Sequence, residues 1–313
     1  MILLVGARWN VGSLLVQELL ALGQKVRLLV RNPEKAALLA QPGVEVVQGA
    51  FTSPAQVCAA MHGVDRVVLL PSPQRGLMEL ERNVVLAAHA TGVRHLVKVS
   101  ASLVGPKLGL ASARWQWHAE QLVRTSGIPY TVLRPAFSMQ NFFHFARSIR
   151  TEGAFHASLR SARVAMVDNR DVAEVAARVL AGGEHAQCTY VLTGSEALTF
   201  DEAAERLSSA VRQRVRYVTV PAREQLERLL AAGVPSCEAE DTQRAYELME
   251  EDWDSELTGE VSTLLGRPPR TFSQFASDHA LLFIRRPAAS PAALSRAGLA
   301  PTAGWRPAEL RTA

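Results

Sequence analysis

Short runs of consecutive apolar residues alternate with segments whose apolar residues recur at helical spacing, and this alternation limits what the chain can fold into. Six runs are predicted to be strands, at residues 2–5, 26–30, 44–47, 64–70, 95–99 and 130–133. Because the runs are largely continuous instead of alternating between apolar and polar residues, both faces of their sheet must be covered. Helical segments between successive strands supply that cover and the crossovers of a parallel sheet. The sequence therefore predicts an α/β fold with a doubly wound parallel sheet.

The pattern becomes irregular and more helical after about residue 150. Asp168 or Asn169 can cap a helix there, and capping boxes at Thr199 and Thr271 begin two more helices. We therefore expect a smaller, mostly helical C-terminal lobe packed over the strand ends. The final segment is rich in proline, alanine and arginine, has few large apolar groups and is expected to be flexible. The expected domains are 1–150, 151–284 and the tail 285–313.

Charge and composition exclude several classes of function. The chain has 34 basic and 30 acidic residues, and because five arginines and one glutamate lie in 285–313, the rest of the chain is neutral. A neutral globular part does not attract a phosphate backbone, so nucleic acid is not an expected partner. No apolar run reaches the roughly 18 residues that a membrane-spanning helix needs. The three scattered cysteines fit a reducing cytoplasm, and neither they nor the eight histidines form a metal-binding motif.

The turn after the first strand has a glycine pattern typical of a dinucleotide site. In Rossmann folds this turn presents helix N-terminal amides to a pyrophosphate. The expected cofactor-binding residues of the turn are Gly6, Arg8, Trp9, Asn10, Val11 and Gly12. Trp9 occupies the place of the middle glycine in a G-x-x-G-x-x-G spacing, where phosphate oxygens normally approach the backbone. Its indole must therefore swing away or obstruct the cofactor.

The end of the second strand indicates which dinucleotide binds. NAD enzymes place Asp or Glu there to hold the ribose hydroxyls, whereas this chain has Arg31. Lys35 follows in the first turn of the next expected helix, and Arg8 lies in the glycine turn. Three cations without a competing carboxylate favour the 2′-phosphate of NADP(H) over NAD(H), although three solvated surface cations would give the same pattern. Pro71, directly after the strand 64–70, completes the expected cofactor-binding set.

Several segments resemble the NmrA-like atypical short-chain dehydrogenases/reductases. These segments are 29–35, 63–65, 92–93, 127–141, 167–173 and 265–269, together with Phe272 and Phe275. The similarity covers nearly all of residues 1–284. The family includes NADPH-dependent quinone, azo-dye and triphenylmethane reductases, together with regulators that bind the dinucleotide without turning it over. The resemblance therefore implies an NADP(H) site and leaves open whether the chain is an enzyme or a sensor.

The chain departs from the pattern of such dehydrogenases at two places besides Trp9. The third strand is followed by Gly49-Ala50 where the resemblance places Gly-Asp, so a carboxylate for the adenine amino group is missing. No tyrosine has a lysine four residues later, and the family's helix spacing puts Ser112 and Gln116 in the places of the Tyr-x-x-x-Lys pair. Ordinary alcohol or ketone reduction is therefore not expected. Hydride transfer to a quinone or a conjugated cation does not demand a strong, positioned acid.

Three polar residues are candidates for a catalytic role. His118 lies on the helix where the tyrosine is missing and is the candidate proton donor, although a surface histidine without a role fits equally well. Lys98 lies near the carboxyl end of an apolar strand and should reach the crevice or extend to an edge. Ser100 follows at the strand end, either as an active-site hydroxyl or as a simple turn residue.

The sequence thus predicts an NADPH-dependent reductase of a small, planar, quinone-like acceptor. Eight of the 19 aromatic residues lie between positions 115 and 155, where they can line a dry crevice or form core. The alternative is a catalytically silent NADP(H) sensor whose smaller lobe contacts another protein. A third reading is that Trp9 and Ala50 abolish binding. A homodimer or a regulatory protein partner is compatible with the first two.

Overall fold

A sheet of seven parallel strands is the centre of the computed structural model, which describes residues 1–6, 11–33, 41–70, 76–182 and 184–285. In spatial order the strands are β10 (Cys188–Leu192), β6 (Tyr130–Pro135), β5 (His95–Val99), β4 (Arg66–Leu69), β1 (Ile2–Val5), β2 (Val26–Val30) and β3 (Val44–Gln48). The strand order reverses between β4 and β2, on either side of β1, which makes the sheet doubly wound. This confirms the predicted fold class.

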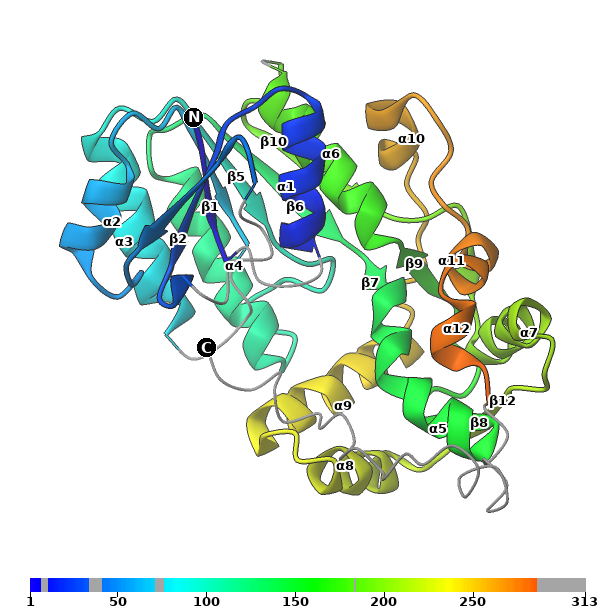
Figure 1. Ribbon diagram of the computed structural model, residues 1–313. Helices are drawn as coiled ribbons and strands as arrows, with labels where there is room; N and C mark the ends of the chain where they lie inside the picture. The colour runs from blue at the N-terminus through cyan, green and yellow to red at the C-terminus, as the bar shows by residue number, and fades with distance from the viewer. Residues whose placement is uncertain (7–10, 34–40, 71–75, 183, 286–313) are drawn as a thin grey trace, which may run out of the picture.

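Helices cover both faces of the sheet (Figure 1). One face carries α1 (Val11–Ala21) and α6 (Asn169–Ala181), and the other carries α2 (Pro54–Ala60), α3 (Leu77–Ala90) and α4 (Ala111–Arg124). Apolar residues at helical spacing, such as Leu15 and Leu19, turn toward the sheet and are fully buried. The double cover explains why the strands are continuous apolar runs.

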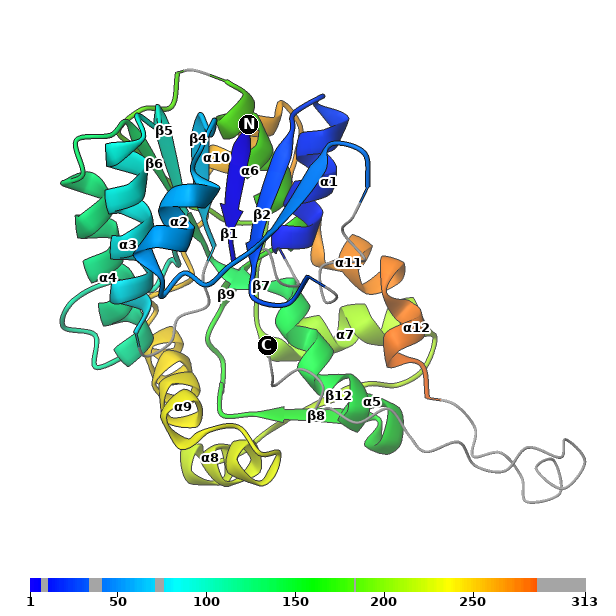
Figure 2. The same ribbon diagram turned by 60° about the vertical axis from the view of Figure 1, so that its left-hand side comes forward.

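A second, smaller lobe lies beyond the carboxyl ends of the strands (Figure 2). Its strands are β7 (Phe137–Ser138), β8 (Ala154–Ala157), β9 (Val164–Val167), β11 (Ala197–Leu198) and β12 (Arg216–Thr219). Its helices are η2 (Met139–Phe145), α5 (Ala146–Glu152), α7 (Phe200–Val211), α8 (Ala222–Ala231), α9 (Ser236–Glu250), α11 (Phe272–Asp278) and α12 (Ala280–Phe283), whereas α10 (Glu260–Leu265) packs against α6 of the first lobe. β11, β9 and β7 form one small sheet, and β12 pairs with β8.

The core of the second lobe is built from phenylalanines. Phe142 is fully buried, and its ring centroid lies 4.8 Å from that of Phe272 and 5.4 Å from that of Phe200. Five of the eight aromatic residues between positions 115 and 155 belong to this core or pack against it. These five therefore hold the lobe together instead of lining a crevice.

The first sheet extends past the predicted boundary at residue 150. β10, which was not predicted from the sequence, pairs in parallel with β6, and α6 packs beside α1 on the same sheet. β10 is an edge strand, and four of its five residues are only half buried, so its sequence lacks a long apolar run. The chain therefore returns to the first sheet after entering the second lobe. The helix expected from Pro33 onward and most of the tail 285–313 lie outside the described residues.

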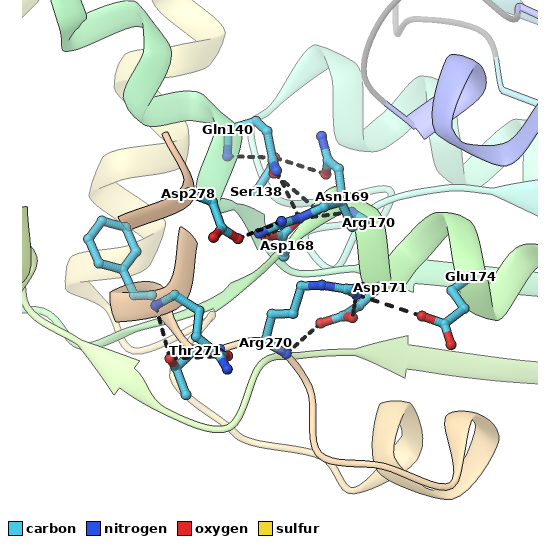
Figure 3. A network of polar contacts seen from close by, with 12 residues as sticks. Ser138, Gln140, Asp168, Asn169, Arg170, Asp171, Glu174, Arg270, Thr271 and Asp278 are labelled. Atoms are coloured by element: carbon cyan, nitrogen blue, oxygen red, sulfur yellow. Dashed lines mark hydrogen bonds and ion pairs between the residues drawn. The ribbon is translucent and has the colours of Figure 1, made fainter. Parts of the chain in front are cut away.

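A polar network joins the start of α6 to the second lobe (Figure 3). Asp168 caps α6 and is fully buried, and the Arg170 guanidinium binds its carboxylate through Nη2 at 2.6 Å. The same guanidinium reaches Asp278 of α11 at 2.7 Å. Gln140 of η2 donates to Asp168 at 2.9 Å, which completes the set of partners. The structure confirms the predicted cap and shows that it also connects three elements.

A second carboxylate of the same helix turn anchors the segment before α11. Asp171 is fully buried, and the guanidinium groups of Arg267 and Arg270 both donate to it. The backbone amide of Arg270 donates to the other carboxylate oxygen at 2.7 Å. Because both guanidinium groups remain about one third exposed, the charges are not wholly desolvated, and the cluster connects the two lobes at little cost.

Asp168→Asn is expected to lower the free energy of unfolding by about 3 kcal/mol at pH 7, because it removes the charge that pairs with a part-buried arginine. Burial alone would raise the pKa of Asp168, but the hydrogen bonds from Arg170 and Gln140 outweigh it and hold the pKa below 3.8. The stabilisation is therefore present above pH 3.8 and is lost as the pH falls further. Urea unfolding of both proteins should show the difference shrinking in acid.

Asp278→Asn is the matched control, because Asp278 is half exposed and shares the same arginine. We expect it to cost less than 1 kcal/mol. An equal loss in both variants would contradict the assignment of the stability to the buried carboxylate.

Candidate functional site

The carboxyl ends of β1, β4, β5 and β6 lie along one edge of the sheet, which faces the second lobe (Figure 2). Gly6 follows β1 with a φ of +90°, a conformation that favours glycine because it has no Cβ. Val11 begins α1, and Gly12 is buried there. The free amides and the dipole of a helix N-terminus favour an anion at this place. Gly6 and the N-terminus of α1, on either side of residues 7–10, thus suit the binding of a pyrophosphate.

The end of β2 presents a positive charge to this edge. Arg31 is exposed and forms no ion pair with any described residue, and its carbonyl accepts a hydrogen bond from Gln48 at 3.4 Å. After β3, Ala50 takes the place of the expected aspartate. Its backbone amide donates to the amide oxygen Oε1 of Gln56 at 2.8 Å. Arg8, Trp9, Asn10, Lys35 and Pro71 lie outside the described residues, and their expected roles stay predictions.

Lys98 lies in the interior, neither in the crevice nor at an edge. Its side chain has no exposed surface, and Nζ donates to Glu81 Oε1 of α3 at 2.6 Å. Burial raises the pKa of Glu81, although the Lys98 ammonium opposes that rise. The expectation that Lys98 reaches the crevice or extends to an edge is therefore wrong. Its ammonium group is instead paired with a buried carboxylate. The pair joins β5 to α3 beneath the site.

Ser100 and Gln116 are buried polar groups with atoms left unpaired. Ser100 Oγ and Gln116 Oε1 have no hydrogen-bond partner among the described residues, and the two side chains are 9% and 4% exposed. Such groups normally find partners, since an unpaired buried polar group costs about 1 to 3 kcal/mol.

The two groups lie at one level of the fold. α4 runs from the carboxyl edge of the sheet toward the amino edge, and Glu120 binds Arg134 near the end of β6 through two hydrogen bonds. Gln116 lies one turn closer to the edge, about 6 Å along the helix. Ser100 follows the last residue of β5 directly. The unpaired atoms therefore both lie toward the carboxyl ends of the strands.

His118 is on the other side of α4. It is exposed, whereas Gln116, Ala119 and Glu120 face the sheet. Its only ring contact among the described residues is with the neighbouring Trp117, at 4.9 Å between centroids. The placement argues against the expected role as proton donor, because the imidazole points away from the strand ends within this chain. That role remains untested.

Ser102 and Asp254 are two polar residues near the strand ends that were not predicted from the sequence. Asp254 lies between α9 and α10, in an acidic stretch that indicates a solvated surface, yet it is 6% exposed. Its carboxyl accepts hydrogen bonds from Ser102 and from the backbone amide of Phe137. No local pattern signals this burial, because the covering residues come from distant parts of the chain.

Comparisons with known proteins agree with this geometry. A family model described as NAD(P)H-binding matches residues 6–182. A NAD(P)H azoreductase of Xenophilus azovorans is 32% identical over 283 residues, which are 90% of this chain and 99% of the relative. A Citrobacter triphenylmethane reductase, solved with NADP(H), is 29% identical, with a TM-score of 0.80 over 90% of this chain and all of that one. An Escherichia coli NADPH-dependent quinone oxidoreductase, solved with NADPH, is 26% identical, with a TM-score of 0.81 over 89% and 99%.

The fold and the site thus define a Rossmann-type NAD(P)H-binding reductase. The chain belongs to the NmrA-like family of atypical short-chain dehydrogenases/reductases. Its residues fit a dinucleotide, because Gly6 has the backbone conformation of a glycine turn and Ser100 and Gln116 have atoms without partners among the described residues. None of the described helices is long and apolar enough to cross a bilayer.

Gln116→Met is expected to raise the free energy of unfolding by about 1 kcal/mol, because it removes a buried acceptor that has no partner. The same change should weaken NADPH binding by about fivefold, because one hydrogen bond to the ligand is lost. Urea unfolding and fluorescence titration measure the two effects.

Gln225→Met is the matched control. Gln225 of α8 is also 4% exposed with an unpaired Oε1, but it belongs to the second lobe. It should gain stability without a change in NADPH affinity. Equal affinities for all three proteins would remove Gln116 from the site.

Proposed function

We propose that this protein is an NADPH-dependent reductase that transfers a hydride directly to a quinone-like or other conjugated acceptor. The observation that carries the proposal is that the neutral residues Ser112 and Gln116 stand where dehydrogenases of alcohols keep a tyrosine and a lysine. Gln116 Oε1 and Ser100 Oγ have no hydrogen-bond partner among the described residues. Two relatives, described as a quinone oxidoreductase and a triphenylmethane reductase, support the same acceptor class.

The chemistry needs positioning more than acid catalysis. The bound dinucleotide supplies the hydride, and the protein must hold a flat acceptor against it and keep water out. Ser100 can donate a hydrogen bond to an acceptor carbonyl, and Gln116 Oε1 can accept one from a ribose hydroxyl. A neutral site suits a quinone, because no charged group has to be desolvated when the acceptor enters.

A preference for NADPH over NADH follows from the end of β2. Arg31 is exposed and forms no ion pair with any described residue, and it stands where NAD enzymes have Asp or Glu to hold the ribose hydroxyls. A guanidinium binds phosphate oxygens by charge-assisted hydrogen bonds, which are stronger than its hydrogen bonds to a neutral ribose hydroxyl. The solved relatives with NADP(H) and NADPH support this choice.

The proposal predicts oxidation of NADPH by a panel of benzoquinones, naphthoquinones, azo dyes and triphenylmethane dyes, followed by absorbance at saturating coenzyme. Turnover of at least one acceptor is expected, with rates above those of heat-inactivated protein. Tight binding of NADPH without turnover of any acceptor would instead support the sensor. Absence of binding would support the reading in which Trp9 and Ala50 abolish the site.

Arg31→Ala is expected to weaken NADPH binding about tenfold and to leave NADH binding unchanged, because only NADPH carries the 2′-phosphate. Arg94→Ala is the control: it removes the same charge from the amino edge of the sheet, where Arg94 pairs with Asp65 in an exposed salt bridge. The Kd values of both coenzymes decide the matter. A parallel loss for NADPH and NADH in Arg31→Ala would show that the arginine does not read the phosphate.

A further inference from the structure

The segment between α9 and α10 crosses the carboxyl ends of three strands of the first sheet, β10, β5 and β6. It also contacts β9 of the second lobe. The amide of Ala165 in β9 donates to the Asp254 carbonyl at 2.7 Å. The amide of Thr258 donates to the Thr193 hydroxyl, just after β10, at 2.9 Å. The Asp254 side chain contacts Ser102 after β5 and the Phe137 amide after β6. The second lobe therefore places one carboxyl directly over the edge that holds the candidate site.

Ser102, which the Asp254 side chain contacts, lies on the same face of the sheet as Ser100. The amides of Ser100 and Ser102 donate to the carbonyls of Leu133 and Pro135 at 2.7 and 2.9 Å, so the ladder between β5 and β6 continues past Val99. Side chains two residues apart on an extended strand face the same way. Ser100 and Ser102 thus share one face, the face on which Lys98 meets α3 and on which α4 packs.

No described charged group offsets the burial of Asp254. β7 and β9, which pack beside it, carry no ionisable side chain, and Lys107 of the loop after β5 is exposed. The acids that precede it on its own segment are engaged elsewhere, Glu250 with Arg160 and Glu251 with Arg244. Burial raises the pKa of Asp254 to about 7, against the hydrogen bonds from Ser102 and Phe137.

We propose that Asp254 supplies the proton that completes reduction of the acceptor, acting through the Ser102 hydroxyl beside the open positions at Ser100 and Gln116. This inference rests on the proposed function. Asp254 does not touch the acceptor in this scheme, so it is a positioning residue that governs a proton held by Ser102.

The step balances. A quinone that gains a hydride has accepted two electrons and one hydrogen nucleus, and it becomes a hydroquinone monoanion. Its oxyanion takes the proton of the Ser102 hydroxyl as the O–H bond of Ser102 breaks. The O–H bond of the Asp254 carboxyl breaks in turn and restores the Ser102 hydroxyl. The Asp254 carboxylate then regains a proton from solvent.

Asp254→Asn tests the proposal, because the amide keeps the shape of the side chain but cannot release a proton. In the wild type, the rate at saturating coenzyme and quinone should fall about tenfold between pH 6 and pH 8, as a group with a pKa of about 7 loses its proton. Asp254→Asn should show no such step and should stay at or below the rate of the wild type at pH 8. Glu251→Gln, the same acid-to-amide change at an exposed position, should follow the wild type.

Thermal melting of the protein without coenzyme gives a second readout. A folded pKa above 3.8 means that the carboxyl stabilises the fold fully below pH 3.8 and that this contribution is lost as the pH rises through 7. The melting temperature of the wild type should therefore fall relative to Asp254→Asn between pH 5 and pH 8. Ser102→Ala should keep this titration and lose the step in the rate, even if Asp254→Asn folds poorly.

The outcomes are distinct. A pH step in the rate of Asp254→Asn equal to that of the wild type would overturn the inference while leaving the reductase intact. A pH step retained in Ser102→Ala would overturn the route through the hydroxyl. A wild type that oxidises no NADPH with any acceptor would refute the proposed function and the proton route together, whereas the melting titration would still report the proton on Asp254.

Discussion

The parallel pairing of β5 with β6 determines where this protein can do chemistry. The ladder of hydrogen bonds continues to Ser102, beyond the last residue of β5, and so places Ser100 and Ser102 on one face of the sheet. α4 must then lie on that face, because the helix that joins two parallel strands packs back on the sheet. The polar end of α4, the two serines and the carboxyl of Asp254 converge for this reason.

Ion pairs with buried carboxylates attach α3 and α4 to β5 and β6. Lys98 of β5 binds Glu81 of α3, and Arg134 of β6 binds Glu120 of α4. Each pair connects a strand near its carboxyl end to a helix in the same layer. Because each pair joins one residue of a strand to one residue of a helix, the two pairs determine how far along the strands α3 and α4 lie. These charges lie deeper in the layer than the neutral side chains of Ser100 and Gln116.

The polar groups at the start of α6 differ in their pairing from those near the strand ends. The polar groups at the start of α6 have partners on all sides, and Asp168 alone engages both Arg170 and Gln140. Ser100 and Gln116 lack such partners among the described residues. A fold retains an unpaired buried group at a cost in stability, and such groups gather where a ligand completes their hydrogen bonds. The carboxylate at the start of α6 is thus fully engaged, whereas Ser100 and Gln116 near the strand ends keep unpaired atoms.

Local sequence rules determined the strands of the first sheet except β10, its double cover of helices, the cap at Asp168 and the glycine turn at Gly6, because apolar periodicity and capping depend on neighbours a few residues apart. Only the tertiary structure decided the partner of Lys98, the outward face of His118, the return of the chain as β10 and the burial of Asp254. Each of these depends on residues tens of positions away, which bring a carboxylate, a strand edge or a cover that no local pattern encodes.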